Sequence, residues 1–185
     1  TDGRHIATCG GTGAYVWDAD TGELVTAFLG HFGNVRCLAF SPDGSRIVTG
    51  GVNDNAARLW EVETGREIKQ FVRTSFDYSA IAFSHDGKKI AAGASGAVLE
   101  ENGEFMGVGL VALWNVETGS MIASFVAHTS SIESIGFFSN DDRFLTASSD
   151  GTAKIWDLQS GEEIWTFGPD AGSAALSPDD RRIAE

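Results

Sequence analysis

Two groups of side chains in this sequence combine the residue types of a hydrolytic site. Each group offers a hydroxyl, an imidazole and a carboxylate, the components of a nucleophile–base–orienter triad. They are His31, Thr49, Asp54 and Trp60, then His128, Thr146, Asp150 and Trp156. A catalytic triad occurs once in a chain, whereas this set occurs twice in the same frame. We therefore expect a buried structural relay, in which carboxylate, imidazole, hydroxyl and indole N–H give one another hydrogen-bond partners.

Other residues with chemical potential carry weaker signals. The Gly-Gly-Thr-Gly stretch at 10–13 precedes no predicted helix, so we interpret it as a hairpin turn rather than a phosphate loop. The acid pairs Asp141-Asp142 and Asp179-Asp180 lack calcium-ligand spacing and are expected to be solvated turn residues. His5 and His85 have no metal-ligating neighbours in the sequence. We expect no catalytic residues, no metal and no cofactor.

The elements that position the two groups belong to an internal repeat. Four segments share one pattern, and their tryptophans are separated by 43, 54 and 42 residues. A period of about 40–45 residues is typical of propeller blades of four strands each. The segments are 17–28, 60–71, 114–125 and 156–167.

One unit, from Glu23 to Glu63, illustrates the predicted strands. Apolar runs at 23–28, 35–40, 46–51 and 56–60 are separated by turn residues, among them Ser-Pro-Asp-Gly at 41–44. Nothing in the unit has a helical period. Residues 80–93, 134–156 and 175–185 repeat parts of this frame, and residues 4–17 repeat its second half.

The sequence resembles the WD-repeat β-propeller family over essentially its whole length. The resemblance depends on Gly30-His31, the 41–44 turn, Asp54 six residues before Trp60, and Trp-Asp at 17–18 and 156–157. It implies an all-β propeller of four-stranded antiparallel blades, with about four blades here as part of a longer array. The expected blades are approximately 1–30 (partial), 31–73, 74–127, 128–170 and 171–185 (partial).

The copies of the family pattern are uneven. Thr74 stands at the histidine position of the middle unit, and residues 168–173 contain no histidine. Gly11 and Val108 replace the turn aspartate in two units. Only the units containing His31 and His128 can therefore build the full internal network.

The third unit is longer than the others by about eleven residues, located within 95–114. Glu-Asn-Gly at 101–103 suggests the tip of a two-stranded extension on the same end as the histidine and aspartate turns. The resemblance implies that this end is the usual binding face. The alternative, which we favour slightly, is a tolerated loop that folds back on its own blade.

Candidate partner-binding residues come from this extension and from matching places near the start of each first strand. A cluster of apolar side chains within an acidic rim would make a suitable protein-binding tip. The candidates are Phe32, Asn34, Arg36, Phe76, Asp77, Tyr78, Phe105, Met106, Ser131 and Glu133.

Composition excludes several partners. A net charge of −13 argues against nucleic acid and against anionic membrane surfaces. No apolar run approaches the ~20 residues that span a bilayer. Cys9 and Cys37 lie in strand-like runs, which favours free buried thiols and a cytoplasmic location.

These observations favour a non-catalytic scaffold that binds protein partners. The alternatives are a sensor or recognition part of a larger multidomain protein, and a propeller that binds a small molecule or glycan. Residues 4–30 supply three strands of a blade, and residues 173–177 supply a first strand. Because Arg181-Arg182-Ile183-Ala184 repeats Arg4-His5-Ile6-Ala7, a closed four-bladed ring would have one strand left over. We expect an excerpt of a larger ring, completed by further blades or by a second copy.

Overall fold

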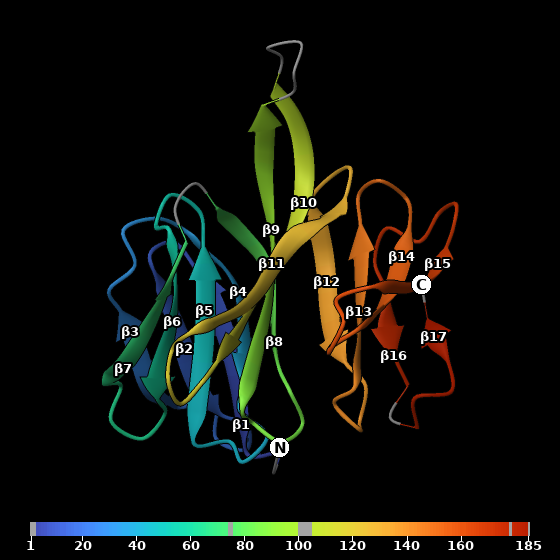
Figure 1. Cartoon of the computed structure of the whole chain (residues 1–185). Helices are drawn as coiled ribbons and strands as arrows, with labels where there is room; N and C mark the ends of the chain where they lie inside the picture. Colours follow the sequence, from blue (N-terminus) through green and yellow to red (C-terminus); the bar gives the residue numbers. More distant parts are fainter. Residues whose placement is uncertain (1–2, 74–75, 100–104, 178, 185) are drawn as a thin grey trace.

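The chain folds into a row of antiparallel sheets joined by turns (Figure 1). The computed structural model describes residues 3–73, 76–99, 105–177 and 179–184. These residues form strands and turns without any helix, so none of them belongs to a membrane-spanning helix. The predicted all-β propeller of four-stranded blades is confirmed.

Three complete blades lie between two partial ones, and each sheet follows the order of the chain. Blade 1 contains β1 (His5–Gly10), β2 (Gly13–Asp18) and β3 (Leu24–Leu29). Blade 2 contains β4 (Val35–Phe40), β5 (Arg46–Gly51), β6 (Ala56–Glu61) and β7 (Glu67–Val72). Blade 3 contains β8 (Asp77–Phe83), β9 (Lys89–Leu99), β10 (Phe105–Asn115) and β11 (Met121–His128). Blade 4 contains β12 (Ile132–Phe137), β13 (Arg143–Ser148), β14 (Ala153–Asp157) and β15 (Glu163–Phe167), and blade 5 contains β16 (Ala175–Leu176) and β17 (Ile183–Ala184).

The turn into the last strand of each blade ends in a glycine with positive φ. The four φ values lie between 70° and 75°, a region that glycine enters without the steric cost of a Cβ. In each turn the glycine N–H donates to the carbonyl of the residue four positions earlier, at 2.9 Å. The repeated Thr-Gly and Ser-Gly pairs are therefore needed to reverse the chain. The glycines are Gly22, Gly65, Gly119 and Gly161.

The core lies between the blades, where a phenylalanine of one blade meets the tryptophan of the next. The ring centroids are 5.7 Å apart for Phe28 and Trp60, and 5.9 Å apart for Phe71 and Trp114. The third junction, Phe125 on Trp156, has a separation of 5.0 Å. Tilted aromatic pairs at such distances contribute about 0.5–1.5 kcal/mol beyond their buried area. The tryptophan period is thus the period of the blade junctions.

Two aspartates at the fourth position of a turn connect neighbouring blades. The Asp141 carboxylate accepts from the backbone N–H groups of His85 and Asp86 in blade 3, at 2.7 and 2.8 Å. Asp180 accepts from the Ser139 N–H of blade 4 at 2.7 Å. Both aspartates have positive φ, 54° and 57°. The expectation that Asp141 and Asp180 are merely solvated is therefore wrong, because each satisfies backbone donors of the preceding blade.

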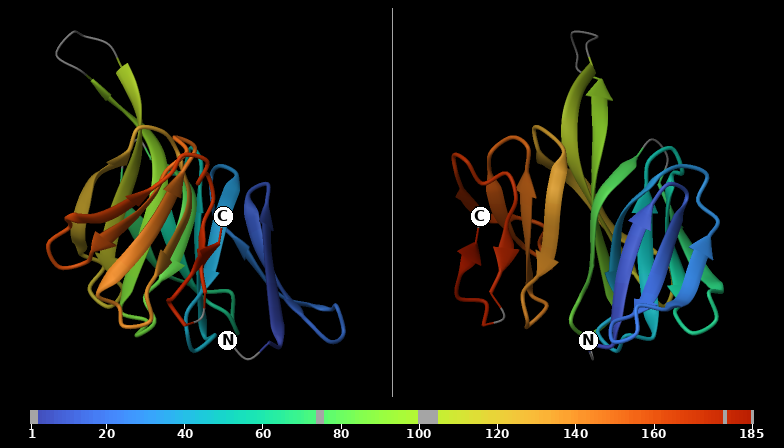
Figure 2. Two further views of the ribbon diagram at one scale, coloured as in Figure 1. Left: turned by 90° about the vertical axis from the view of Figure 1, so that its right-hand side faces the viewer. Right: turned by 180° about the vertical axis from the view of Figure 1, so that it is seen from behind.

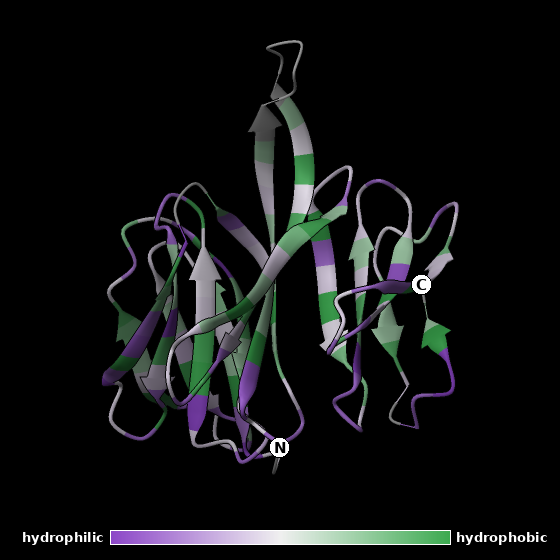
Figure 3. Cartoon of the chain, viewed as in Figure 1, coloured by the Kyte–Doolittle hydropathy of each residue, from purple (hydrophilic) through white to green (hydrophobic). Residues whose placement is uncertain are grey.

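The inserted segment forms the two-stranded extension rather than a loop that folds back. β9 and β10 pair continuously from Lys89 with Asn115 to Leu99 with Phe105. The hairpin protrudes beyond the other sheets at one end of the blades (Figure 1). Figure 3 shows several hydrophobic bands along β10 in this part of the hairpin. The predicted tip, residues 100–104, lies outside the described residues.

The two ends of the row do not join among the described residues. β16 pairs with β17, while β1 pairs with β2, and the two pairs belong to separate sheets. In the right-hand view of Figure 2 the blue N-terminal sheet and the red C-terminal hairpin lie on different sides of the molecule. The described chain is therefore an open row of blades.

Candidate functional site

The first relay is continuous from the carboxylate to the indole. His31 lies in the turn before β4, Thr49 in β5, Asp54 in the turn between β5 and β6, and Trp60 in β6. His31 Nδ1 is 2.5 Å from Asp54 Oδ2, and His31 Nε2 is 2.6 Å from Thr49 Oγ1. The Trp60 indole N–H donates to the same hydroxyl at 2.8 Å. The relay thus links β5 and β6 to the two turns that hold His31 and Asp54 at one end of blade 2.

Arg58 is a buried member of the first relay that sequence reasoning missed. Its Nε and Nη2 donate to Asp54 at 3.0 and 3.1 Å, and its Nη1 donates to Glu67 at 2.8 Å. Burial alone would raise the pKa of Asp54, but the bonds from Arg58 and from the Phe32 N–H lower it below its ordinary value. The repeat indicates the pair of Arg58 with Glu67, because Lys154 and Glu163 stand at the matching places in blade 4, where the lysine donates to the glutamate.

The second relay repeats the first with different outer partners. His128 Nδ1 is 3.0 Å from Asp150 Oδ2, and His128 Nε2 is 2.8 Å from Thr146 Oγ1. The Trp156 indole N–H donates to Thr146 at 2.8 Å. Here Thr152, rather than an arginine, supplies the additional donors to the aspartate, at 2.7 Å from its hydroxyl and 2.9 Å from its N–H.

Burial and hydrogen bonding fix the charge states of both relays. Burial lowers the pKa of His31 and of His128, which favours neutral imidazoles. For Asp150, burial raises the pKa but the Thr152 hydroxyl and the N–H groups of Thr129 and Thr152 lower it more, to about 2. Each aspartate therefore remains an anion that accepts from a neutral histidine at pH 7.

Neither relay offers a hydroxyl to a substrate. Thr49 and Thr146 are completely buried, and each hydroxyl is already bonded to an imidazole and an indole. A nucleophile must be reachable by the bond that it attacks. The arrangement can hold strands together, and it has no room for a reacting carbonyl.

The other blades contain less of the network. In the described part of blade 1 the last bond of the network remains, from the Trp17 indole N–H to Thr8 Oγ1 at 2.8 Å. In blade 3 Trp114 packs against Tyr78 and Phe71 at 6.3 and 5.9 Å. Thr74, the predicted histidine replacement in that blade, lies outside the described residues.

Most candidate binding residues whose side chains are described are accessible at the hairpin end. Phe32 is 85% exposed and Met106 is 42% exposed. Asn34, Arg36 and Glu133 are exposed, and Ser131 is half-buried. Phe105 is placed in β10 by its backbone alone. These residues lie on turns, early in first strands, or on the hairpin.

The structure contradicts the surface placement of Phe76 and Tyr78. Both are buried in the apolar cluster between blades 2 and 3, Tyr78 from β8 and Phe76 from the residue before that strand begins. Phe76 lies under the Arg73 guanidinium, 4.2 Å from it, and Tyr78 packs on Trp114. Asp77, between them, is half-buried and accepts from the Asn53 N–H at 2.9 Å.

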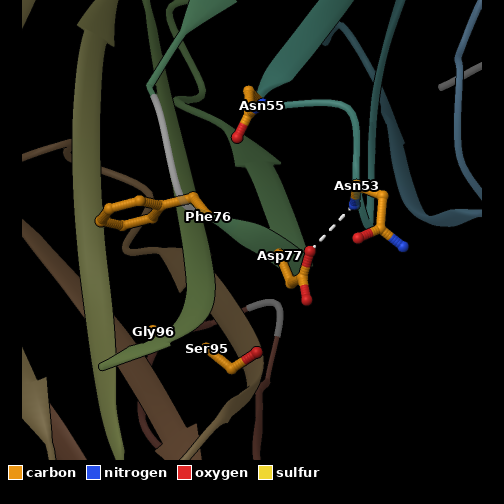
Figure 4. Close-up of a pocket in the computed structure, with 6 residues that line it drawn as sticks. All are labelled: Asn53, Asn55, Phe76, Asp77, Ser95 and Gly96. Atoms are coloured by element: carbon orange, nitrogen blue, oxygen red, sulfur yellow. Dashed lines mark hydrogen bonds between the residues drawn. The ribbon is translucent and has the colours of Figure 1, made fainter. Parts of the chain in front are cut away.

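A hollow of about 520 Å³ opens beside these residues, between blades 2 and 3 (Figure 4). Asp77 and Asn53, joined by the hydrogen bond drawn in Figure 4, both line it, and Ser95 and Gly96 contribute the base of the hairpin. Another hollow, of about 360 Å³, lies between the hairpin and blade 4, with Met106 and Val126 among its lining residues. The described residues contain no group of three His, Cys, Asp or Glu side chains that could hold a metal ion.

Comparison with a known family identifies the same two units as the geometry does. The model of the "WD domain, G-beta repeat" family matches residues 22–61 and 119–157. The first stretch contains the whole relay from His31 to Trp60, and the second contains the relay from His128 to Trp156. The matched units are thus the two with a complete network.

Similar proteins are much longer than this chain. Periodic tryptophan protein 2 of Arabidopsis thaliana is 25% identical over 82% of this chain, which corresponds to 11% of that protein. Telomerase protein component 1 of Mus musculus is 28% identical over 99% of this chain and 7% of its own length. Eukaryotic translation initiation factor 3 subunit I of Nematostella vectensis is 36% identical over 42% of this chain and 23% of its own length. The chain therefore spans less than a quarter of each of these relatives.

Proposed function

Because this chain is a WD-repeat protein, we propose that it is a non-catalytic interaction module whose hairpin end binds a protein partner. WD repeats generally mediate protein–protein interaction, and these units are held rigid by buried relays. The observation that carries the proposal is the β9–β10 hairpin, which projects from the end where Phe32 and Met106 are exposed. A rigid frame that presents accessible apolar side chains loses little entropy on binding.

The antiparallel order of the blades supports this choice of end. Every turn that leads into a first strand, and every turn between second and third strands, lies at one end of its sheet. Phe32 and Asn34 belong to the first kind of turn, and the hairpin replaces one of the second kind. We propose that the accessible candidate residues form one surface at this end, from which Phe76 and Tyr78 are excluded by their burial.

Charge indicates the kind of partner that this surface would attract. The chain carries 26 acidic and 13 basic residues, and Glu100, Glu101 and Glu104 stand in the sequence between Leu99 and Met106. An acidic surface accelerates encounter with a basic partner and disfavours an acidic one. We propose a partner that brings apolar and basic side chains to the hairpin end.

A role within a larger assembly is the second candidate. This chain matches only 7–23% of the length of the three relatives compared. Such a small share favours the hypothesis that the chain is the recognition part of a multidomain protein. One of these relatives is named as a subunit of a translation initiation factor. We propose a cytoplasmic location, supported by the two cysteines, which are both free thiols.

The test compares the proteins retained by the immobilised chain and by three variants. One variant replaces residues 99–106 with a two-residue turn, and one carries Phe32→Ala. The control, Lys88→Ala, alters an exposed lysine at the opposite end of blade 3. Partners that bind the purified chain directly should bind the first two variants more weakly and the control normally.

Melting curves and circular dichroism of the same variants should match those of the parent chain. Equal binding by all variants, or equal loss by the control, would contradict the proposed surface. Hydrolysis of ester, peptide or phosphate substrates by the parent chain, abolished by Thr49→Ala, would contradict the non-catalytic assignment.

A further inference from the structure

The outermost strands of the blades carry β-bulges that hinder pairing with another chain. In each of blades 1 to 4, the ladder between the last two strands has a register irregularity beside the tryptophan. The residues passed over in the ladders are Val25, Ile68, Ile122 and Ile164. A bulge on an edge strand increases its twist and makes the addition of a further strand unfavourable. The outer edges of the blades are therefore poor templates for a partner.

The hairpin has an edge without such a bulge. The ladder between β9 and β10 shows no register irregularity over its whole length. β8 pairs with β9 only as far as Ser95, so β9 from Gly96 to Leu99 has one edge without a partner among the described strands. The sequence of this part, Gly-Ala-Val-Leu, contains neither a charge nor a proline. A regular edge of this kind is a template on which an extended peptide can add as a strand.

The direction of the backbone groups on this edge follows from the repeat. In blades 2 and 4 the N–H groups of Val52 and Ser149 donate, at 2.9 and 3.0 Å, to the carbonyl of the residue that precedes the first strand. Ser95 holds the same place in blade 3, opposite Asp77 of β8. Backbone groups alternate in direction along a strand, so those of Ala97 point to the same side as those of Ser95. Ala97 therefore directs a donor and an acceptor to the free edge of β9.

The hollow of about 520 Å³ at the foot of this edge is suited to a cationic side chain (Figure 4). Ser95 and Gly96 line it from β9, and Asp77 is the only charged side chain among the described residues that line it. One oxygen of Asp77 accepts from the Asn53 N–H, which holds the carboxylate in place. A lysine or arginine beside this carboxylate would form a charge-assisted hydrogen bond.

Charge favours this edge, and a basic partner, over two alternatives. The hollow beside the β10 edge of the hairpin is lined by Lys154 as well as Asp150, so its charges offset each other. A second copy of this chain would bring a net charge of −13 to a hairpin of the same charge, which is repulsive. The β9 edge with Asp77 at its foot therefore fits an extended segment that carries positive charge.

We propose that a partner binds by adding one extended segment as a strand to β9 along Gly96–Leu99, with a lysine or arginine side chain in the hollow beside Asp77. The backbone of the segment pairs with Ala97, and its basic side chain contacts the carboxylate. The hairpin thus becomes a sheet of three strands, the third supplied by the partner. This inference rests on the proposed function, because it describes how the hairpin end binds.

Fluorescence anisotropy with a labelled peptide tests the proposal on the whole 185-residue chain. The probe is a short peptide in which valine alternates with arginine and threonine. Two further peptides carry N-methyl groups on one or the other set of alternate backbone nitrogens. The set that faces β9 should weaken binding at least about 10-fold, because its backbone donors are lost, while the set that faces solvent should have little effect. Equal binding of both methylated peptides, or no binding of the probe up to about 1 mM, would overturn strand addition.

Two proline variants identify the edge. Ala97 lies opposite Gly107 in the ladder, so the backbone groups of both point away from the hairpin. Proline is tolerated where the N–H faces solvent, and a Cβ at Gly107 meets no atom within 4 Å. Ala97→Pro should weaken binding of the probe at least about 10-fold, whereas Gly107→Pro, the matched change on the other edge, should leave it unchanged. The reverse result would place the added strand on β10 and overturn the proposal. Circular dichroism checks that both variants fold, and the methylated peptides test the same pairing without any change to the protein.

A charge variant tests the contact with the hollow. Asp77→Asn keeps an acceptor for the Asn53 N–H and removes the charge. It should bind the arginine peptide roughly 5–10-fold more weakly, and should bind a peptide with glutamine in place of arginine as the parent chain does. The control, Glu117→Gln, alters an exposed acid in the turn after β10, at the opposite end of blade 3. An equal loss in both variants would assign the effect to net charge and contradict the contact with Asp77.

Failure of this binding mode and failure of the proposed function give different results. If Ala97→Pro retains the protein partners that the chain with the shortened hairpin loses, strand addition is overturned and the proposed function stands. If the probe binds at β9 while every hairpin variant retains the same proteins, strand addition stands and the proposed function is contradicted. A chain of twice 19.6 kDa that becomes single in Ala97→Pro would show that a second copy occupies the edge, which would also overturn the proposal.

Discussion

Replacing Asp54 with alanine should destabilise this protein more than replacing its counterpart Asp150. The Asp54 side chain is fully buried and accepts from His31, from the Phe32 N–H and twice from Arg58. Its removal leaves the Arg58 guanidinium, itself 7% exposed, with Glu67 as the remaining carboxylate partner. The buried guanidinium thereby loses one of its two carboxylate partners.

The expected magnitudes follow from these contacts. Removing one partner of a buried ion pair costs about 3–5 kcal/mol. Asp150→Ala removes the acceptor of neutral donors on His128, Thr129 and Thr152, for which about 1–3 kcal/mol is usual. In a chain of this size, 1 kcal/mol lowers the melting temperature by about 2–4 °C. Asp54→Ala should therefore lower it by roughly 6–20 °C, clearly more than Asp150→Ala.

A double-mutant cycle isolates the contribution of the arginine. Arg58→Met keeps an unbranched apolar chain at the site and removes the charge. In the Asp54→Ala background this second change should recover about 1–3 kcal/mol, measured by urea unfolding followed by tryptophan fluorescence. Equal destabilisation by Asp54→Ala and Asp150→Ala, together with no recovery in the double mutant, would refute the reasoning.

Three further outcomes are expected. Lowering the pH from 7 should lower the urea midpoint of unfolding, because the pKa values of His128 and Asp150 are both lower in the folded state. The first loss is expected near pH 6.5, where His128 becomes protonated in the unfolded chain, and the second between about pH 4 and 2 for Asp150. A midpoint that rises would contradict these assignments. Asp141→Gly should lower the free energy of unfolding by about 1–2 kcal/mol and speed hydrogen exchange at the His85 amide. Unchanged exchange would mean that the link between blades is weak. Burial raises the pKa of Cys37 to about 12, so iodoacetamide at pH 8 should modify it only after unfolding, as peptide mass spectrometry would show.

The fold and the two relays could be predicted because they depend on spacing. The tryptophans recur 43, 54 and 42 residues apart, and two of them follow a histidine and an aspartate at matching places, which predicts the same packing in those units. The protruding hairpin could also be expected, although the sequence alone slightly favoured a loop that folds back. Continuous pairing from Lys89 to Leu99 decides between the two.

Side-chain direction near the starts of the first strands is the weaker part of the prediction. In the repeat frame Phe76 matches Gly33, which has no side chain to compare, whereas Tyr78 matches Val35, which is itself buried. The register irregularity of β8 between Tyr78 and Ala80 recurs in β4 after Val35, and such a shift changes which side chains face the core. The role of Asp141 was missed for another reason, because its bonds reach a different blade, about 55 residues away in the sequence.

The aspartate links between turns limit how the repeats can be reordered. The turn of blade 2 has Pro42 at its second position, which lacks an N–H, and the next blade has Gly87 where Asp141 and Asp180 stand later. His85 and Ser139, which have N–H groups, are each followed one blade later by an aspartate. A gene that placed Asp141 after Pro42 would leave the carboxylate without that N–H donor, and one that placed Gly87 after His85 would leave the amide without its carboxylate. The blades are therefore not freely interchangeable, because each of these turns depends on the matching residue of the blade before it.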